Sequence, residues 1–469
     1  MGNTSQAESL AMGIELNKWV VDVETNINNR EAEDPAMGTE VKDWVVDINT
    51  GVESFSLCDE KKNWAATSIY RVPSFIRDIR ERAFTPTVVS FGPYHHNAPR
   101  LRPVEEHKRR ALIHFLEMAR RPLDDFINEM RTIEKQLQDS YHNLDKKWKD
   151  PKHPDQFLML MILDGCFMLE VMRMKDEKPR KERYAANDPV FSSYGVNHRL
   201  PYIMRDMLVM ENQLPLLVLK KLLEVEGLQC EMDDVFINEM ILQFFGVKAK
   251  TTGLGLHPLD VYRKSLLHGT PPWPPLPPIP SQSFEVLRSA VELRESGVKF
   301  RKSNSTSLAD IDFQDGVLGL PQITVDDNTE STLLNIVAFE HLHVGTSSEV
   351  TSYVCFMDEI IDSAEDVRLL HRKGITRNAT GSDESVAELF GSLSKEVTTD
   401  PQCRLRYVRQ QVNKYCQKKW HNWRAVLRHK YFNTPWSAIS LMAAILIILL
   451  TAAQTFYSIY QYYHPSGKS

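Results

Sequence analysis

The chain has 469 residues, 42% of them hydrophobic and 25% charged, and its mean hydropathy is −0.34. This length suits one large domain or two to three ordinary ones, and the composition excludes a protein that crosses a membrane many times. All 62 acidic residues lie before Pro401 with 46 of the 56 basic ones, and so acidic a body excludes nucleic acid as its partner, because phosphate binding requires a basic face.

The first 60 residues are expected to form a partly disordered N-terminal segment that contains a short duplication. The sequence MGIELNKWVVDVETNI, which begins at Met12, recurs as MGTEVKDWVVDINTGV at Met37. Two copies are too few for a solenoid, so we expect each copy to form a short amphipathic helix. Gly2 is a candidate for myristoylation, but Gln6 stands where that motif has Ser or Thr, and lipidation therefore stays open.

Residues 61–400 are expected to form a mainly helical domain. A tight β-hairpin is predicted where Asp315 and Gly316 stand between alternating apolar residues, because this dipeptide suits a two-residue hairpin turn. Residues 87–91 are a candidate for one more strand. Elsewhere apolar residues recur at spacings of three and four, as on one face of a helix, in the stretches 105–121, 156–174, 204–226, 236–245 and 331–343.

A stretch rich in glycine and proline interrupts this domain near residues 246–283. It culminates in PPWPPLPPIP, which begins at Pro271. Consecutive prolines favour the extended polyproline II conformation. We therefore predict a stiff surface linker, with a ligand for an SH3-like groove as the alternative.

The C-terminal part of the chain contains a long uncharged run from Ala438 to Tyr460. Its apolar stretch of about 18 residues is close to the length that a bilayer core requires. We predict one transmembrane helix over residues 436–460, followed by a short tail at 461–469, so the membrane lipid is itself an expected partner. Trp436 and Tyr457 are expected at the two membrane interfaces, where amphipathic rings gather.

Flanking charge predicts the orientation of this helix. Residues 401–435 carry nine Lys and Arg and no acidic residue, whereas Lys468 alone follows the span. The positive-inside rule therefore places the body in the cytosol, as in a tail-anchored, single-pass protein of the plasma membrane or an endomembrane. On this topology we expect no glycosylation at the three sequons, Asn3, Asn304 and Asn378.

The basic segment at 401–435 is itself predicted to be a juxtamembrane helix. Trp420 and Trp423 lie among its charges, and both are expected at the membrane interface. Such a helix could lie along an anionic leaflet, since each cation near the surface adds on the order of 1 kcal/mol. A solvated helical stalk is the alternative.

A series of short motifs in a fixed order resembles a known plant family, the domain of unknown function 247. The resemblance runs from Ile69 to about Thr455, with Phe91 and Asn97 as mild departures from the family pattern. The motifs that carry it are IYRVP (69–73), VSFGPYHH (89–96), LDGCFMLE (163–170), DMLVMENQLP (206–215), LRSAVELRESGVKF (287–300), FMDEIIDSAEDV (from 356), GSDESVAELF (381–390) and KKWHNWRAVLRHKYFNTPWSAIS (from 418).

This resemblance implies a plant membrane protein of largely helical fold. The family is named for its lack of an assigned activity, and it supplies no catalytic residues that could be carried over to this sequence. Some members in grasses have been linked to self-incompatibility between pollen and stigma. Any site must therefore be sought in the residues themselves.

The catalytic candidates are His95, His96, Asp164 and Glu211. Adjacent histidines point to opposite sides of an extended chain and a metal needs three or four convergent ligands, so we expect no metal here. Asp164, in an apolar helix, is expected to bind a backbone N–H or to pair with an arginine. Glu211 is expected, with Asn212 and Gln213, to satisfy backbone groups where one long helix turns near Pro215.

Other polar patterns give no stronger site. His341 and His343 are two apart on a predicted helix, so their side chains diverge. The six cysteines form no CxxC pair and are read as reduced, without a zinc site or a disulfide framework. The sequence lacks GxxxxGK[ST], GxGxxG, GxSxG and the kinase motifs, and we predict no cofactor.

Two functional hypotheses follow. The first is a membrane-tethered protein-interaction or recognition component, whose partner the sequence does not identify and whose anchor raises the effective concentration of that partner. The second is a membrane-bound enzyme of unrecognised chemistry, such as a hydrolase. A third, in which the body shapes or tethers membranes, rests on the basic segment alone.

Overall fold

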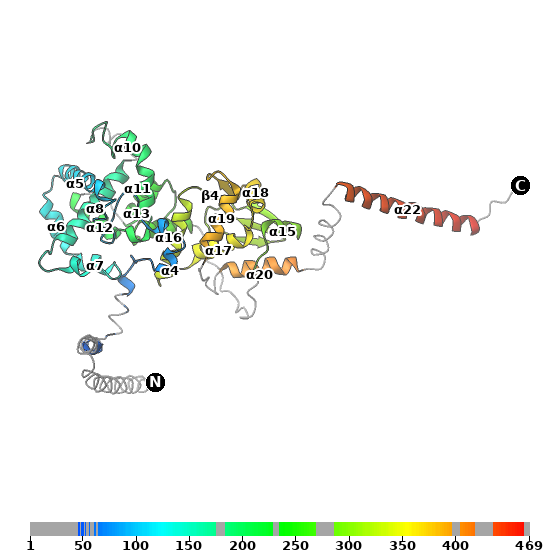
Figure 1. Ribbon diagram of the computed structural model, residues 1–469, viewed down its shortest axis with the longest axis horizontal. Coiled ribbons are helices and arrows are strands. Elements are labelled where there is room, and N and C mark those ends of the chain that lie inside the picture. The colour runs from blue at the N-terminus through cyan, green and yellow to red at the C-terminus, as the bar shows by residue number, and fades with distance from the viewer. Residues whose placement is uncertain are drawn as a thin grey trace, which may run out of the picture. The chain divides into compact units, whose positions relative to one another are not determined.

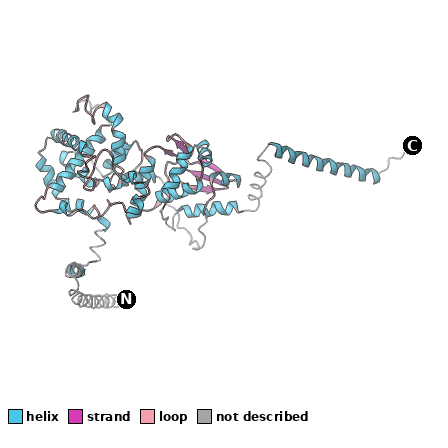
Figure 2. Cartoon of the chain, viewed as in Figure 1, coloured by secondary structure: helices cyan, strands magenta, loops and turns pink. Residues whose placement is uncertain are grey.

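The computed structural model describes single residues between 46 and 66 and the ranges 67–174, 183–227, 234–268, 286–395, 404–417 and 435–463. The chain divides into two units, Met1–Ala66 and Thr67–Ser469, and nearly all of the described residues belong to the second. Helices dominate this unit and its strands are short (Figures 1 and 2), which confirms the expected mainly helical fold. Trp19 and Trp44, in the two copies of the duplicated motif, lie outside the described residues.

The first half of the body is helical. Its longest helix, α8 (Gln156–Arg173), is buried on nearly all sides, as expected for an apolar helix without a polar face. The helices predicted at 105–121, 156–174 and 236–245 are confirmed. The other elements of this half are α4 (Ser74–Arg77), η1 (Glu81–Phe84), η2 (Arg102–Val104), α5 (Glu105–Ala119), α6 (Leu123–Arg131), α7 (Glu134–Asp139), η3 (Lys146–Lys149), α10 (Ser193–His198), α11 (Leu200–Asp206), η4 (Met210–Asn212), α12 (Leu216–Glu226), α13 (Asp234–Phe245) and α14 (Pro258–Leu266).

The second half of the body combines helices with two small sheets. In one sheet β3 lies between β1, to which it is parallel, and β2, to which it is antiparallel; in the other, β4 is parallel to β5. The elements are α15 (Ala290–Glu295), β1 (Lys299–Lys302), β2 (Asp312–Gln314), β3 (Val317–Leu320), β4 (Ile323–Val325), α16 (Thr329–Leu342), α17 (Glu349–Ile360), α18 (Ala364–Arg372), β5 (Thr376–Asn378), α19 (Asp383–Leu393), α20 (Arg404–Cys416) and α22 (Pro435–Tyr463).

The predicted hairpin is confirmed as β2 and β3. Asp315 and Gly316 have φ values of 52° and 79°, and two positive φ angles in succession are what a type I′ turn requires. The strands β1, β4 and β5 were not predicted from the sequence. Runs of three or four residues are too short to show an alternating pattern, and their partners are distant in the chain.

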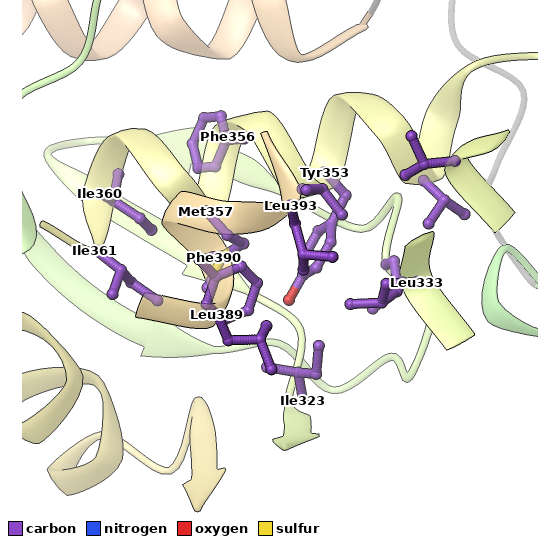
Figure 3. Close-up of a cluster of buried hydrophobic side chains, with 14 of the residues drawn as sticks. Ile323, Leu333, Tyr353, Phe356, Met357, Ile360, Ile361, Leu389, Phe390 and Leu393 are labelled. Carbon is purple, nitrogen blue, oxygen red and sulfur yellow. The ribbon is translucent and has the colours of Figure 1, made fainter. Parts of the chain in front are cut away.

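Two hydrophobic clusters fill the body. The first surrounds α8 and α12, and the second surrounds α16, α17 and α19. Figure 3 shows side chains of the second cluster, in which Phe356 and Met357 of α17 lie with Phe390 and Leu393 of α19. The two halves are joined because η1 and η4, from the first half, pack against α16.

Two predictions about the first half are wrong. The helix predicted at 204–226 is broken into α11, η4 and α12, because side chains of the intervening residues bind backbone groups that a continuous helix would use internally. Pro215 then stands at the start of α12. Residues 87–91 form no strand, because their N–H groups donate to side chains and not to a neighbouring strand.

Two further segments differ from expectation. Residues 258–266, inside the stretch predicted to be a linker, form the largely buried helix α14, which packs against α13 and α16. The sequence PPWPPLPPIP lies outside the described residues. In the basic segment, Leu405, Val408 and Val412 of α20 are buried in the second cluster, so the apolar face of this part packs on the body.

The C-terminal helix α22 is long and apolar enough to cross a membrane. Its segment Met442–Tyr460 has a mean hydropathy of 1.9, and none of it is buried. Of the residues expected at the membrane interface, Tyr457 is exposed on α22 and Trp436 belongs to the same helix. Trp420 and Trp423 lie outside the described residues.

A buried histidine links α14 to the start of the body. His257 Nδ1 accepts a hydrogen bond from the Asp260 N–H at 3.2 Å, which caps α14, and Nε2 donates to the Ser68 carbonyl at 3.1 Å. These two partners fix the neutral tautomer with its proton on Nε2. Burial lowers the pKa of His257 to about 4, because a charged ring would lose its hydration.

Replacing His257 with asparagine, which can still cap α14, is expected to change how stability depends on pH. In the wild type the unfolded chain takes up a proton at this residue near pH 6.5 and the folded chain only near pH 4, so stability is lost as the pH falls between these values. The loss is roughly 3 kcal/mol for a shift of this size. We therefore expect the free energy of unfolding of the full chain in detergent to fall less steeply over this interval in H257N.

The matched control for this prediction is His153→Asn, since His153 is exposed in a loop. H153N is expected to keep the wild-type pH profile. If the wild type and H257N lost stability equally between pH 6.5 and pH 4, then His257 would not be held neutral by the fold.

Candidate functional site

The irregular loop at residues 87–96 is held by side chains from other elements. Asp206, at the end of α11, accepts hydrogen bonds from the consecutive N–H groups of Thr87 at 2.8 Å, Val88 at 2.6 Å and Val89 at 3.0 Å. Burial raises the pKa of Asp206, although these three N–H groups oppose the shift. One carboxylate thus takes the place of a neighbouring strand.

Asn212 and Gln213 continue this pattern. Asn212 accepts from the Phe91 N–H at 2.8 Å and donates to the Val89 carbonyl at 3.0 Å. Gln213 accepts from the Leu259 N–H at 3.0 Å, and its amide donates to the carbonyls of Met207 and Val209, which lie between α11 and η4. The expectation that these amides satisfy backbone groups is confirmed, although they end one helix and begin another instead of turning a single long one.

A fully buried ion pair lies beneath the same loop. Lys108 Nζ on α5 is 2.7 Å from Asp164 Oδ1 on α8, and neither side chain is exposed. Asp164 Oδ2 accepts from the Gly92 N–H at 2.8 Å, while Lys108 also donates to the Ser90 carbonyl at 2.6 Å. Burial raises the pKa of Asp164 to about 6 against the opposing charge of Lys108. Asp164 therefore binds a backbone N–H as expected, but its ionic partner is a lysine.

Glu211 connects the loop to α4. Its Oε1 accepts from the Val72 N–H at 2.7 Å and from the Arg77 guanidinium, and its Oε2 lies 3.4 Å from His95 Nε2. Burial alone would raise the pKa of Glu211, but His95, the Val72 N–H and Arg77 hold it below its usual value. The His95 ring is close enough for an ion pair when protonated, but it is not aligned for a hydrogen bond.

The neighbouring aromatic residues of the loop contact different partners. His96 packs edge-on against Trp148, with ring centroids 5.4 Å apart, and burial lowers the pKa of His96. The Tyr94 hydroxyl donates to the His142 carbonyl, and the Arg71 guanidinium lies over the Tyr94 ring at 4.5 Å. The two adjacent histidines therefore act separately.

The structure brings some of the sequence candidates together and not others. His95 and Glu211 meet, whereas His96 turns to Trp148 and Asp164 binds Lys108. Sequence reasoning missed three residues that complete this network. Asp206 lies in the motif DMLVMENQLP and Arg77 lies four residues after IYRVP, whereas Lys108 lies twelve residues after VSFGPYHH.

The chemical capacity of this network is limited. Among the residues that the structure describes, no group of three or more His, Cys, Asp or Glu side chains could hold a metal ion. His341 and His343 diverge, since the first contacts Phe75 and the second contacts Tyr70. Within the described chain, His95 forms no hydrogen bond to a serine, threonine or cysteine that it could activate as a nucleophile.

Comparison with known proteins gives relatives but no activity. A family profile described as a plant protein of unknown function matches residues 69–450. The UPF0481 protein At3g47200 of Arabidopsis thaliana is 30% identical over 84% of this chain and 86% of its own length. The putative UPF0481 protein At3g02645 of the same plant is 23% identical over 83% and 89%. No solved structure matches the chain.

Gly92 is the position at which this network tolerates a side chain least. It has φ of +69°, and a Cβ atom there would lie 2.7 Å from the Tyr141 hydroxyl and 2.8 Å from the Gln213 carbonyl oxygen. Gly92→Ala is therefore expected to cost about 1–2 kcal/mol of backbone strain and about 1–3 kcal/mol of overpacking. Thermal unfolding of the full chain in detergent, followed by circular dichroism, measures the total.

Gly253→Ala separates these two contributions. Gly253 has a similar φ of +65°, but nothing lies within 4 Å of its added Cβ. G253A is expected to show the strain without the overpacking. Equal destabilisation by the two variants would mean that the loop does not pack tightly against Tyr141 and Gln213.

Proposed function

The chain belongs to the plant DUF247 family of proteins of unknown function, and from that premise we propose that it is a membrane-anchored recognition protein whose body faces the cytosol. The observation that carries the proposal is α22. Its apolar segment Met442–Tyr460 is not covered by the body, and a bilayer is the environment in which such a helix is stable.

Charge supports the cytosolic orientation. The 34 residues from Pro401 to Thr434 contain nine basic and no acidic residues, and only Lys468 follows the apolar run. The cytosolic side of a membrane-spanning helix carries the excess of Lys and Arg. The buried face of α20 attaches part of this basic segment to the body. The last described helix before α22 therefore belongs to the body.

An exposed apolar surface near α4 supports a recognition role. This α4 surface consists of Phe75, which is 47% exposed, and His341, together with Val344, which is 97% exposed and follows His341 by three residues in the chain. The Phe75 and His341 rings meet edge-on at 6.1 Å. Aromatic side chains are typical of the centre of protein interfaces.

The polar network gives this surface a rigid support. Arg77 binds Glu211, which also binds the Val72 N–H, so both ends of α4 are fixed from beneath. A rigid interface loses less entropy on binding. Anchoring then confines encounters to the membrane surface, where a weak interface becomes sufficient because the effective concentration is high.

An enzyme is the second candidate, and the contact between His95 and Glu211 is the observation that favours it. A carboxylate beside a histidine can orient a general base. However, Glu211 Oε1 is already bound to Val72 and Arg77, and no described nucleophile touches His95. We therefore rank recognition above catalysis.

The proposed topology predicts the glycosylation state of the chain. Asn304 and Asn378 lie in sequons of the body, and neither is expected to carry a glycan because the body would not enter the lumen. A glycosylation tag placed after Ser469 is expected to be modified. Treatment with a deglycosidase should then shift the mobility of the tagged chain and leave that of the untagged chain unchanged; the opposite result would reverse the orientation.

The recognition role predicts which surface substitutions disturb the neighbours of the protein. Proximity labelling in plant cells, with the full chain fused to the labelling enzyme, should lose a specific set of membrane-associated neighbours in Phe75→Asp and Val344→Asp. Ile113→Asp is the matched control, because Ile113 is 64% exposed on α5, which lies apart from α4 (Figure 1). Neighbours that persist in both α4-surface variants would exclude this surface as the binding site.

A further inference from the structure

A cavity of about 390 Å³ lies where the two halves of the body meet. One side is formed by Met204 of α11, Phe245 of α13 and Tyr262 of α14, and the other by Thr324 of β4 and Leu333 of α16. Small-molecule sites typically have volumes of about 300–1,000 Å³ and occur where separately packed parts of a protein join. Both the size and the place of this cavity fit that description.

The cavity is apolar inside and polar at its mouth. Leu208, Leu308 and Leu333 are at most 5% exposed and form its floor, whereas Thr324 and Asp326 are exposed at its rim. This gradient suits a ligand that has an apolar body and a polar end, because each part then meets a matching wall.

The free edge of β4 adds backbone groups to the rim. The Ile323 N–H donates to the Ile375 carbonyl at 2.9 Å, and the Val325 carbonyl accepts from the Ala379 N–H at 2.8 Å. Both residues thus pair with β5. Because successive residues of a strand turn their N–H and C=O groups to opposite edges, the N–H and C=O of Thr324, which lines the cavity, lie on the edge that does not pair with β5.

The two charged side chains in the wall differ in whether they can still form a hydrogen bond to a ligand. Arg205 is occupied, since it donates to the Arg82 carbonyl at 2.6 Å and lies 3.3 Å from Asp206. Asp326 Oδ1 accepts from the Asn328 N–H at 3.0 Å and from the Thr329 hydroxyl at 2.8 Å, but Oδ2 accepts no hydrogen bond from the described residues. Arg205 and Asp326 are the charged members of the described wall, so the wall offers a carboxylate oxygen and no free cation.

A phenol also contributes to the polar part of the wall. Burial raises the pKa of Tyr262, and the nearby charge of Asp326 adds to this effect, so its hydroxyl stays neutral and can donate. Behind the floor, the buried Tyr353 hydroxyl has no hydrogen-bond partner in the described chain, and Figure 3 shows its oxygen on the side where Ile323 and Leu333, two wall residues, lie.

We infer that this cavity binds a small molecule that has an apolar body, at least one hydroxyl or amine donor and no anionic group. The apolar floor excludes a wholly polar ligand, since burying such a ligand there would leave its polar groups unpaired. The free oxygen of Asp326 accepts from a hydroxyl or ammonium group and repels an anion. The site is independent of the α4 surface and does not require it to bind a partner.

Three fluorinated fragments that differ only in their polar group test this inference. 4-Fluorobenzyl alcohol, 4-fluorobenzylamine and 4-fluorobenzoate are added singly to the full chain in lipid nanodiscs, and binding is measured by broadening of the fluorine resonance relative to empty nanodiscs. We expect the alcohol and the amine to bind and the benzoate to bind at least tenfold more weakly. Absence of binding by all three, or equal binding by all three, would overturn the inference.

Two pairs of variants locate the binding. Thr324→Trp places an indole at the mouth and should weaken alcohol binding at least tenfold, whereas Thr132→Trp, at the exposed end of α6, should not. Asp326→Asn keeps the Oδ1 acceptor but removes the charge, so the preference for amine over benzoate should fall by about two- to fivefold. Asp327→Asn, at the exposed neighbour outside the wall, should leave that preference unchanged; an equal effect of both asparagine variants would contradict the assigned site.

Discussion

The rest of the body depends on the hydrogen bonds by which buried side chains hold the loop at 87–96. This loop has no strand beside it, and an unpaired buried N–H costs about as much free energy as a lost hydrogen bond. Asp206 satisfies three successive N–H groups, Asn212 a fourth and Asp164 a fifth. Because these three side chains come from α11, η4 and α8, fixing the loop also fixes those elements relative to one another.

The same contacts decide what the polar residues of this region can do. A general base needs a free lone pair that can reach a substrate, but the oxygens of Asp164 and Asp206 are taken by N–H groups or by Lys108. His95 is partly exposed, and it faces a carboxylate that Arg77 already neutralises. The polar side chains that suggest catalysis in the sequence serve here as hydrogen-bond partners for backbone groups that have no neighbouring strand.

Sequence alone predicted the features that arise from local pattern. Apolar spacing located α5, α8, α13 and α16, two residues located the hairpin turn, and an uncharged run located α22. It could not predict that Asp206 binds residues 87–89, because a hydrogen bond between residues 119 positions apart produces no periodic pattern in the sequence. For the same reason it could not predict that this contact replaces the expected strand. The break between α11 and α12 has the same origin, since apolar periodicity continues through a segment whose side chains compete for the backbone.

Because the polar groups of the interior are already bonded to one another, a partner or ligand would bind at the surface or at the junction of the two halves. The α4 surface is supported by Arg77 and Glu211, while the cavity is walled on one side by residues next to Asp206 and on the other by β4 and α16. Both features therefore touch elements that the network fixes, so a ligand at either place would meet a preformed surface and would not first have to order it. Neither feature uses the polar side chains of the motifs, because those side chains already form hydrogen bonds and ion pairs within the body.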